Sequence, residues 1–335
     1  MDSRRYFLRP FFEADYEAVA QLETKLTPEF PSSPDTARSW DRLLAASHYL
    51  HESWVVEERD TGTVVGAASM YHTPYSFDPH RFRVSVEVDP EHLHRGIGRA
   101  LAALLDAEAV AHRATCFWTN VRRDDPRALR FAAQNGFAEL RTMWMSLLDV
   151  AHSSAASFEE RSDLLERDGI RFTTLAQEGV GRPEVLHRLF DLWNETGRDV
   201  PRIGKFTPVS FEQFSAEFDE PHLIPEAVFL AAHGDSYVAS SHLERDLGQL
   251  DTLIVGYTGT RAEYRGRGLA TELKRRSLDY ARAHGTRYLR TFNDSLNQPI
   301  WAINAKLGFR RVLEWSNQQR LFGTGGTTTE VPSAR

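Results

Sequence analysis

Hydrophobic and polar residues follow one order along this chain, and that order occurs twice. In each half a short β-rich run comes first, apolar residues at helical spacing come next, and a loop with several prolines follows. The opening strands are expected at 6–9 and 170–175, the first helices at 15–25 and 183–196, and the loops at 28–34 and 201–208. The pattern predicts two units of similar architecture.

Each half continues with a hairpin, a long strand and a helix. The hairpin turns are expected at 60–62 and 232–234, between runs rich in β-branched and aromatic residues. The later elements are expected as long strands at 82–88 and 250–260, helices at 98–112 and 270–284, and closing strands at 143–148 and 313–320. A further strand and a short helix precede each closing strand, which is expected to complete its own half.

One constant offset links the two halves, and it is the distance along the chain from Gly96 to Gly268. Gly96 lies 40 residues before Gly136, and Gly268 lies 40 residues before Gly308. The two hairpin turns are separated by the same offset. Chance is a poor explanation for a turn, a glycine loop and a Gly-Phe pair at one offset, so we interpret the chain as a tandem repeat.

The repeat also predicts the domain boundaries. We expect an N-terminal domain at 1–150, a linker at 151–168, a C-terminal domain at 169–322 and a disordered tail at 323–335. The linker joins an Ala/Ser-rich stretch to a charged helical segment. The tail holds Gly, Thr and Pro with almost no large apolar residue, which is typical of disorder.

Composition and charge narrow the class of protein. The chain has 335 residues, 41% hydrophobic and 26% charged, as globular proteins do, and it is long enough for two domains. Its net charge of -7 argues against nucleic-acid or membrane binding as its main role. The single cysteine, Cys116, excludes a disulfide framework and a Cys-rich metal site, so no metal is expected. No secretion signal or membrane span is recognised, which predicts a cytoplasmic protein.

Two glycine-rich loops follow the long strands and open the next helices. They contain Leu93-His-Arg-Gly-Ile-Gly98 and Arg265-Gly-Arg-Gly-Leu-Ala270. Such a loop exposes backbone N–H groups at the positive end of a helix, where pyrophosphate binds readily and glycine lets phosphate oxygens approach. A tight strand-to-helix turn is the alternative. The Rossmann fingerprint and the P-loop both fit these loops poorly.

The motifs of the C-terminal half resemble those of the GCN5-related N-acetyltransferase (GNAT) family. The family's acyl-CoA signature is Gln/Arg-x-x-Gly-x-Gly/Ala. It is matched by Arg265-x-x-Gly268-x-Ala270, followed by Asn293, Asn297 and Leu307-Gly308-Phe309.

The N-terminal half is similar to the same family. It has Gly96-x-Gly98, Asn120 and Gly136-Phe137, although Leu93 and His94 replace the family's Gln/Arg and its frequent glycine. The resemblance covers 4–150 and 169–322. It implies an α/β fold of two tandem GNAT domains, each with a mixed, mainly antiparallel central sheet flanked by helices.

The resemblance also implies which residues hold the donor, acetyl-CoA or another acyl-CoA. Loop backbone would cradle the pyrophosphate, and groups on the flanking strands would pair with the pantetheine arm. In the C-terminal half these residues are Thr258, Thr260, Arg265, Gly266, Arg267, Gly268, Leu269, Ala270, Thr271, Asn293 and Asn297. In the N-terminal half they are Val86, Val88, Arg95, Gly96, Ile97, Gly98, Arg99 and Asn120.

Charge distinguishes the two halves. Residues 89–118 carry three Lys/Arg and four Asp/Glu, whereas residues 261–290 carry nine Lys/Arg and three Asp/Glu. A basic rim favours a ligand with several phosphates, and a solvated helix face is the alternative for 274–276. We therefore expect the C-terminal half to be productive and the N-terminal half to be degenerate. Alanine at Arg265 and Arg267 is expected to abolish turnover, whereas bulky residues at Gly96 are not.

In this family an amine attacks the thioester carbonyl directly, which requires an oxyanion donor and a path for the amine proton. The resemblance assigns the donor to a strand N–H near Thr258. The candidate bases are Glu244 and Asp251, on strands that face the substrate. Glu87 and His80 rank below them, and proton removal through ordered water is an alternative.

The family's frequent catalytic acid is absent from both halves. It is a tyrosine four residues before the glycine of the Gly-Phe pair, and Ala132 and Asn304 occupy that position here. Neither side chain donates a proton as tyrosine does. The thiolate would then leave unassisted or take its proton from water.

The expected function is transfer of an acyl group, with acetyl favoured, from acyl-CoA to the primary amine of a small molecule. The loop 197–205 mixes three cations with Asp199, which suits an acceptor with both an amine and a carboxylate, or else is a charged surface loop. The alternatives are a non-catalytic acyl-CoA sensor or scaffold, and an aminoacyl or peptidyl transferase that uses charged tRNA. A monomer is favoured over a homodimer.

Overall fold

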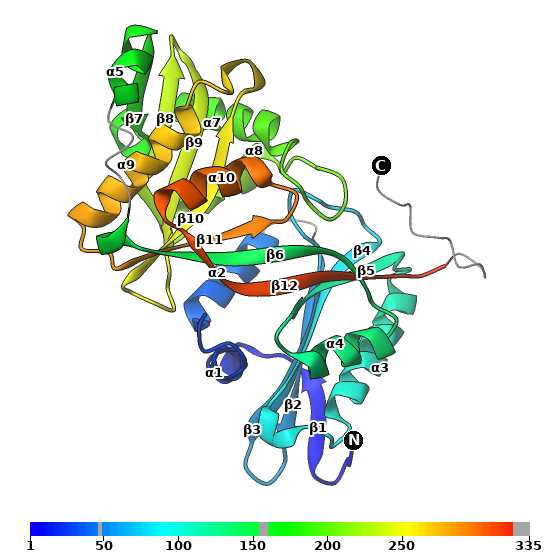
Figure 1. The fold of residues 1–335 in the computed structure, drawn as a ribbon. Helices are drawn as coiled ribbons and strands as arrows, with labels where there is room; N and C mark the ends of the chain where they lie inside the picture. Colours follow the sequence, from blue (N-terminus) through cyan, green and yellow to red (C-terminus); the bar gives the residue numbers. More distant parts are fainter. Residues whose placement is uncertain (46–48, 154–159, 324–335) are drawn as a thin grey trace.

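A computed structural model describes residues 1–45, 49–153 and 160–323 (Figure 1). The elements of the N-terminal half are β1 (Tyr6–Pro10), α1 (Tyr16–Leu26), α2 (Pro34–Ala45), β2 (His51–Glu58), β3 (Thr63–Tyr71), β4 (Arg81–Val88), α3 (Ile97–Ala111), β5 (Cys116–Arg122), α4 (Pro126–Gln134) and β6 (Ala138–Asp149). The helices form where apolar residues recur at helical spacing, as in α1, whose buried residues are Tyr16, Ala20 and Leu22.

The C-terminal half repeats this order after the linker helix α5 (Glu160–Arg167). Its elements are β7 (Ile170–Thr174), α6 (Leu175–Glu178), α7 (Pro183–Gly197), α8 (Phe211–Ala216), β8 (Leu223–His233), β9 (Ser236–Arg245), β10 (Thr252–Thr260), α9 (Leu269–Ala283), β11 (Tyr288–Asp294), α10 (Gln298–Leu307) and β12 (Arg310–Leu321). The expected disordered tail lies outside the described residues from position 324 on, as does 154–159 of the expected linker.

Helices α2 and α8 lie in segments to which the sequence analysis assigned no element. α2 begins at Pro34, whose fixed φ suits the first helical position. α8 begins after Ser210, which forms a capping box with Gln213. These local signals were available in the sequence, but both helices are short and follow proline-containing loops.

In the part of the chain that the structure describes, twelve strands form one sheet in the order β1-β2-β3-β4-β5-β12-β6-β11-β10-β9-β8-β7. Within the described residues, β4–β5 and β10–β11 are the parallel pairs and the remaining pairs are antiparallel. This confirms the expected α/β fold with a mixed, mainly antiparallel sheet.

The two halves exchange their closing strands. β6 of the N-terminal half pairs with β11, and β12 of the C-terminal half pairs with β5. β6 and β12 also pair with each other and cross the middle of the molecule (Figure 1). The expectation that each closing strand completes its own half is therefore wrong, because each closing strand pairs with a strand of the other half. The domain boundaries stay a prediction, because units defined by strand pairing differ from units defined by chain order.

Helices cover both faces of each half-sheet. The helix after each glycine loop packs its apolar side on one face, with Ile97 and Leu101 of α3 in one core cluster and Leu269 and Leu273 of α9 in another. The opposite faces are covered by α1 in one half and by α7 and α8 in the other. With both faces covered by helices, a ligand can reach the sheet backbone at the strand edges beside the glycine loops.

Candidate active site

Each half-sheet opens into a V beside its glycine loop. β4 and β5 pair in parallel over three residue pairs that end at Arg83 and Trp118. β10 and β11 likewise pair over three residue pairs that end at Ile254 and Arg290. Beyond these positions the strands diverge, so backbone groups on the facing edges are available to an extended ligand.

A cavity of about 1880 Å³ occupies the V of the N-terminal half and continues under α1 and α2. Its lining includes seven of the eight N-terminal residues assigned to the cofactor, which are Val86, Val88, Gly96, Ile97, Gly98, Arg99 and Asn120. The eighth, Arg95, donates instead to the hydroxyl of Tyr6 at 2.9 Å.

The exchanged strands bring residues of the C-terminal half into the wall of this cavity. Asn317 of β12 lines it and donates its side-chain amide to the side-chain oxygen of Asn120. Asn293 and Asn297, assigned from the sequence to the C-terminal cofactor site, also line it. The N-terminal cavity is therefore built by both halves.

Both glycine loops adopt the same backbone conformation. Gly96 and Gly268 precede their helices with φ of 82° and 95°. His94, which departs from the family pattern, has a φ of 60°, close to the 74° of Gly266 at the matching position. Histidine tolerates this left-handed region better than most side chains do. The replacement of glycine by His94 has thus not changed the shape of the N-terminal loop.

Alternate residues of β3 and β4 form a polar floor in the N-terminal cavity. Arg83, Ser85 and Glu87 of β4 all line it, and Ser85 lies 2.9 Å from the hydroxyl of Ser69 on β3. Glu23 of α1 lines the cavity as well. Glu87 is among the lower-ranked candidate bases from the sequence, and Glu23 and Arg83 are not among the candidates. The available signal was a polar residue at every second position of the strand, Arg81, Arg83, Ser85 and Glu87, with apolar residues between them.

Glu87 of this floor and Glu23 of α1 both have raised pKa values. Burial, and then the negative charge of Glu23, raise the pKa of Glu87 to about 8 against the opposing effect of Arg83. Burial also raises the pKa of Glu23, and a hydrogen bond with Ser32 opposes this shift. A carboxylate with a pKa near neutral pH in a cavity is a good candidate for a general base.

The C-terminal half carries a β-bulge at the matching strand. The register of β10 against β9 shifts between Val255 and Thr258, whereas β4 pairs with β3 without a shift. Bulges often re-aim groups beside active sites. Next to this bulge, the Nε2 atom of His242 lies 2.7 Å from Glu244, the first of the candidate bases. Burial raises the pKa of Glu244, but the hydrogen bond and charge of His242 outweigh it and hold that pKa below its usual value.

Gly256 allows this His242–Glu244 pair to lie against β10. A Cβ at Gly256 would lie 2.2 Å from Nε2 of His242 and 2.5 Å from Oε1 of Glu244. We expect Gly256→Ala to lower the free energy of unfolding by about 1–3 kcal/mol through overpacking, measured by urea denaturation. Gly181, whose added Cβ would contact nothing within 4 Å, is the control. Equal effects of the two alanines would contradict the close packing.

Asp251, the second candidate base, lies far from the V. It precedes β10 at the end where that strand is paired with β11, and its side chain accepts a hydrogen bond from Thr252. Its backbone carbonyl accepts from the N–H groups of Arg287 and Tyr288. The structure thus brings Glu244 close to the bulge and leaves Asp251 at the opposite end of the strand.

The cofactor residues assigned to the C-terminal half surround the second V. Thr258 bonds the hydroxyl of Ser241 at 2.9 Å, and Arg265 pairs with Asp199. The guanidinium of Arg267 lies over the ring of Tyr264. The other assigned loop and strand residues, Thr260, Gly266, Gly268, Leu269, Ala270 and Thr271, lie between the end of β10 and the first turn of α9. None of the residues 255–271 lines the described cavity.

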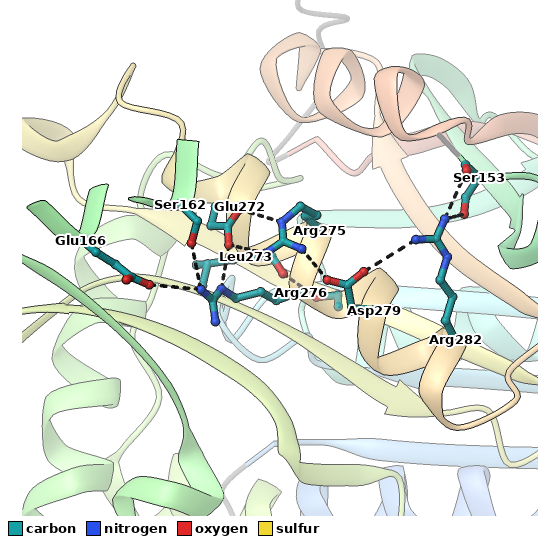
Figure 2. A network of polar contacts seen from close by, with 10 residues as sticks. Ser153, Ser162, Glu166, Glu272, Leu273, Arg275, Arg276, Asp279 and Arg282 are labelled. Carbon is teal, nitrogen blue, oxygen red and sulfur yellow. Dashed lines mark hydrogen bonds and ion pairs between the residues drawn. The ribbon is translucent and has the colours of Figure 1, made fainter. Parts of the chain in front are cut away.

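Many of the cations that distinguish the C-terminal half are engaged within the protein. Arg275 and Arg276 pair with Glu272 at 2.7 and 2.8 Å, and Arg282 lies near Asp279 and Ser153 (Figure 2). Arg276 also reaches Ser162 and Glu166 of α5. Some of these pairs join side chains within α9, and others join α9 to α5. They reduce the positive charge that is available to bind phosphates.

At two further positions, the V of the C-terminal half has larger side chains than the V of the N-terminal half. Ala102 and Ala132 line the N-terminal cavity, and Lys274 and Asn304 stand at the equivalent positions of the C-terminal half. Lys274 is 4% exposed, and burial lowers its pKa to about 7. Asn304 is fully buried and donates to Asn293 at 3.0 Å.

A loop of the N-terminal half lies over the C-terminal half. The hydroxyl of Tyr75 donates to Glu217 at 3.1 Å, and the Tyr75 ring stacks with Phe206. Arg202, from the segment expected to form a substrate wall, donates to the carbonyl of Tyr75 at 2.9 Å and also lines the N-terminal cavity. That segment therefore lies between the halves.

One group of side chains has the composition of a metal site. Glu52, Glu108 and His112 each offer a ligand atom, and these atoms lie within 4.8 Å of one another at half-buried positions. No metal is expected from the sequence. Glu52 lies on β2, Glu108 on α3 and His112 directly after α3, and none of the three lines the N-terminal cavity.

A mixed sheet that opens into a V beside a glycine-loop helix, twice in one chain, defines a tandem acyltransferase architecture. Comparison with known families supports this directly, because residues 16–137 and 186–309 both match the acetyltransferase (GNAT) family. The chain belongs to this family and is an acetyltransferase by class. The family uses acetyl-CoA as its acyl donor and an amine as its acceptor.

Curated relatives and solved structures agree with the tandem arrangement. The chain is 27% identical over 230 residues to a mycothiol acetyltransferase of Clavibacter michiganensis subsp. michiganensis, covering 67% of this chain and 68% of that one. It is 26% identical over 237 residues to the mycothiol acetyltransferase of Stackebrandtia nassauensis, covering 68% and 71%. A tandem GNAT protein from the clavulanic acid biosynthesis pathway shares the fold, with a TM-score of 0.73, 21% identity and coverage of 96% and 100%. Among the described residues, no helix is long and apolar enough to cross a membrane.

Proposed function

We propose that this protein transfers an acyl group, with acetyl favoured, from acyl-CoA to the primary amine of a small molecule, and that the reaction takes place in the N-terminal cavity. One observation carries the proposal. The cavity of about 1880 Å³ joins the glycine loop 93–98, the open edge of β4 and two half-buried carboxyl groups in one space. The similarity to mycothiol acetyltransferases favours acetyl as the acyl group.

The residues of this cavity fit an acyl-CoA. Gly98 lines the cavity on the first turn of α3, where a Cβ would contact the ring of Phe131 at 3.4 Å, so a larger side chain would enter the groove. The backbone N–H groups of the loop lie at the positive end of the 15-residue helix α3, which favours a pyrophosphate. Arg99 and Arg130, which also line the cavity, add positive charge on the same side.

The chemistry follows from the floor of the cavity. The bound donor supplies a thioester whose carbonyl carbon accepts the amine. Glu87 takes a proton from the amine as the C–N bond forms, and a backbone N–H on the open edge of β4 stabilises the developing oxyanion. The C–S bond then breaks, and the CoA thiolate takes a proton from water. This deprotonation step distinguishes the proposal from a non-catalytic acyl-CoA sensor, which has no need of a carboxyl with a raised pKa.

The C-terminal half remains a second location for the same reaction. The bulge of β10, the His242–Glu244 pair and the cations Arg265 and Arg267 support it. The two locations make opposite predictions for variants of the two glycine loops.

A matched pair of substitutions separates these locations. Gly98 and Ala270 occupy equivalent positions on α3 and α9, related by the same offset as Gly96 and Gly268. We expect Gly98→Val to weaken acetyl-CoA binding by about tenfold or more, because the added methyl groups enter the groove, and Ala270→Val to leave it within about twofold. Calorimetric titration gives affinity and stoichiometry, and thermal unfolding checks that both variants fold.

The opposite ranking would place the donor in the C-terminal half, as the sequence analysis expected. A stoichiometry of two donors per chain would mean that both halves bind. Bulky residues at Gly96 are a poorer test, since a Cβ there would already lie 2.6 Å from the Met1 nitrogen.

A further inference from the structure

The floor of the N-terminal cavity carries opposite charges at its two ends. Arg83 and Glu87 lie four residues apart on the same face of β4, and both line the cavity. At about 3.3 Å per residue their Cα atoms are roughly 13 Å apart. A ligand lying along β4 would therefore meet a cation at one end and a carboxylate at the other.

The Arg83 guanidinium is positioned by aromatic rings. It lies 5.7 Å from the ring centre of Tyr71 and 5.2 Å from that of Trp118. In the described part of the chain, no carboxylate lies within ion-pair distance of it. A guanidinium held between rings and lining a cavity presents its planar set of N–H donors to a carboxylate.

Other cations of the cavity wall already have partners. Arg122 pairs with Glu29 and Asp124, Arg141 pairs with Asp294, and Arg320 pairs with Asp106. Arg202 donates to backbone carbonyls. Arg99 and Arg130 lie on α3 and α4, on the side assigned above to the donor phosphates. Arg83 is thus the floor cation available to the acceptor.

The other end of the floor suits an amine. Glu87 on β4 and Glu23 on α1 interact electrostatically across the cavity. Asp41, a further acid of the lining, is bound by Tyr16 and lies 3.0 Å from His51. Glu23 and Glu87 are therefore the carboxyl groups to which a protonated amine binds before it loses its proton.

Resting on the proposed function, we infer that the acceptor is an amine with a carboxylate at its far end, held with the amine between Glu23 and Glu87 and the carboxylate on Arg83. Two hydrogen bonds of about 3 Å take up part of the span along β4, which leaves roughly 7 Å between the two groups. This is the length of a chain of about six bonds, as in an ω-amino acid or the side-chain amine of a basic amino acid. An α-amine beside its own carboxylate is too short to reach both ends.

The test uses the full chain, acetyl-CoA and two acceptors of equal length, 6-aminohexanoate and its uncharged analogue 6-aminohexanamide. Thiol release gives kcat/KM for each, and the measured quantity is the ratio of the two values. We expect a ratio of about ten or more in the wild type, a ratio near one in Arg83→Met, and an intermediate ratio in Arg83→Lys. A ratio within one variant is insensitive to partial unfolding of that variant. Arg81→Met, two residues earlier on β4 and outside the cavity lining, is the control and should keep the wild-type ratio.

A wild-type ratio near one, or a high ratio that persists in Arg83→Met, would overturn the inference and leave the proposed function intact. Absence of thiol release with every amine would contradict the proposed function. In that case calorimetric titration with 6-aminohexanoate still decides the inference, because binding should be at least about tenfold weaker in Arg83→Met than in the wild type. Equal binding would refute it.

Discussion

Replacement of Glu87 by glutamine is expected to lower kcat/KM for acyl transfer by about 100-fold or more, because glutamine cannot take the proton of the attacking amine. The effect should fall on kcat, because the base is lost, and also on KM, because glutamine lacks the charge that binds the protonated amine. Steady-state thiol release with acetyl-CoA and a reactive amine measures it. Glu91→Gln, a change at an exposed residue that pairs with Lys25, is the matched control.

The pH profile gives a second readout of the same substitution. The pKa of Glu87 is raised to about 8 by burial and by Glu23, so the base is protonated below that pH and the rate should rise as pH increases through about 8. Arg83 faces the same carboxyl and opposes the shift. Glu87→Gln should lose this limb of the profile. Glu23→Gln should move it to lower pH, because it removes the neighbouring negative charge.

An unchanged rate in Glu87→Gln would exclude Glu87 as the base. Loss of activity in Glu244→Gln instead would place the chemistry beside the bulge of β10, where sequence analysis expected it. Retention of activity in both variants would favour proton removal through ordered water.

Neither half is expected to fold when it is produced alone. Residues 1–153 would lack β12, which pairs with β5, and residues 160–335 would lack β6, which pairs with β11. Each fragment would also leave the edge of a half-sheet unpaired beside apolar surface, which favours aggregation. Circular dichroism and urea denaturation of each fragment should show no cooperative transition, whereas production of both together should restore one.

Cleavage between the halves provides the control for this experiment. A protease site inserted between positions 153 and 160 allows the folded chain to be cut without removing any strand. The two pieces should remain associated through gel filtration, because β6 and β12 are interleaved. Two fragments that fold and separate freely would contradict the exchange of strands.

The tandem fold was predictable from the sequence because its signals are local and are repeated. The glycine loops, the hairpins and the constant offset between them depend on neighbouring residues, and the structure reproduces them. The exchange of closing strands depends on which edge each strand meets in space. Since the strands 143–148 and 313–320 have equivalent partners available in either half, no periodicity in the chain distinguishes the two pairings.

The candidate site was predictable in part for the same reason. The loop 93–98 was recognised by its glycines, and His94 did not alter its shape. Net charge, in contrast, favoured the C-terminal half because it counts cations without their partners, and Arg275 and Arg276 are paired with Glu272. Glu23 comes from a helix about 60 residues before Glu87, so only the folded chain brings the two carboxyl groups into one cavity.

The exchange of β6 and β12 also constrains how this protein changes over evolutionary time. A half that loses its chemistry cannot be deleted, because its closing strand supports the sheet of the other half. Substitutions in the exchanged strands are expected to affect both halves at once, because each strand pairs with strands of both halves. Each closing strand completes the sheet of the other half, so the scaffold of a half is required even where its own chemistry is not.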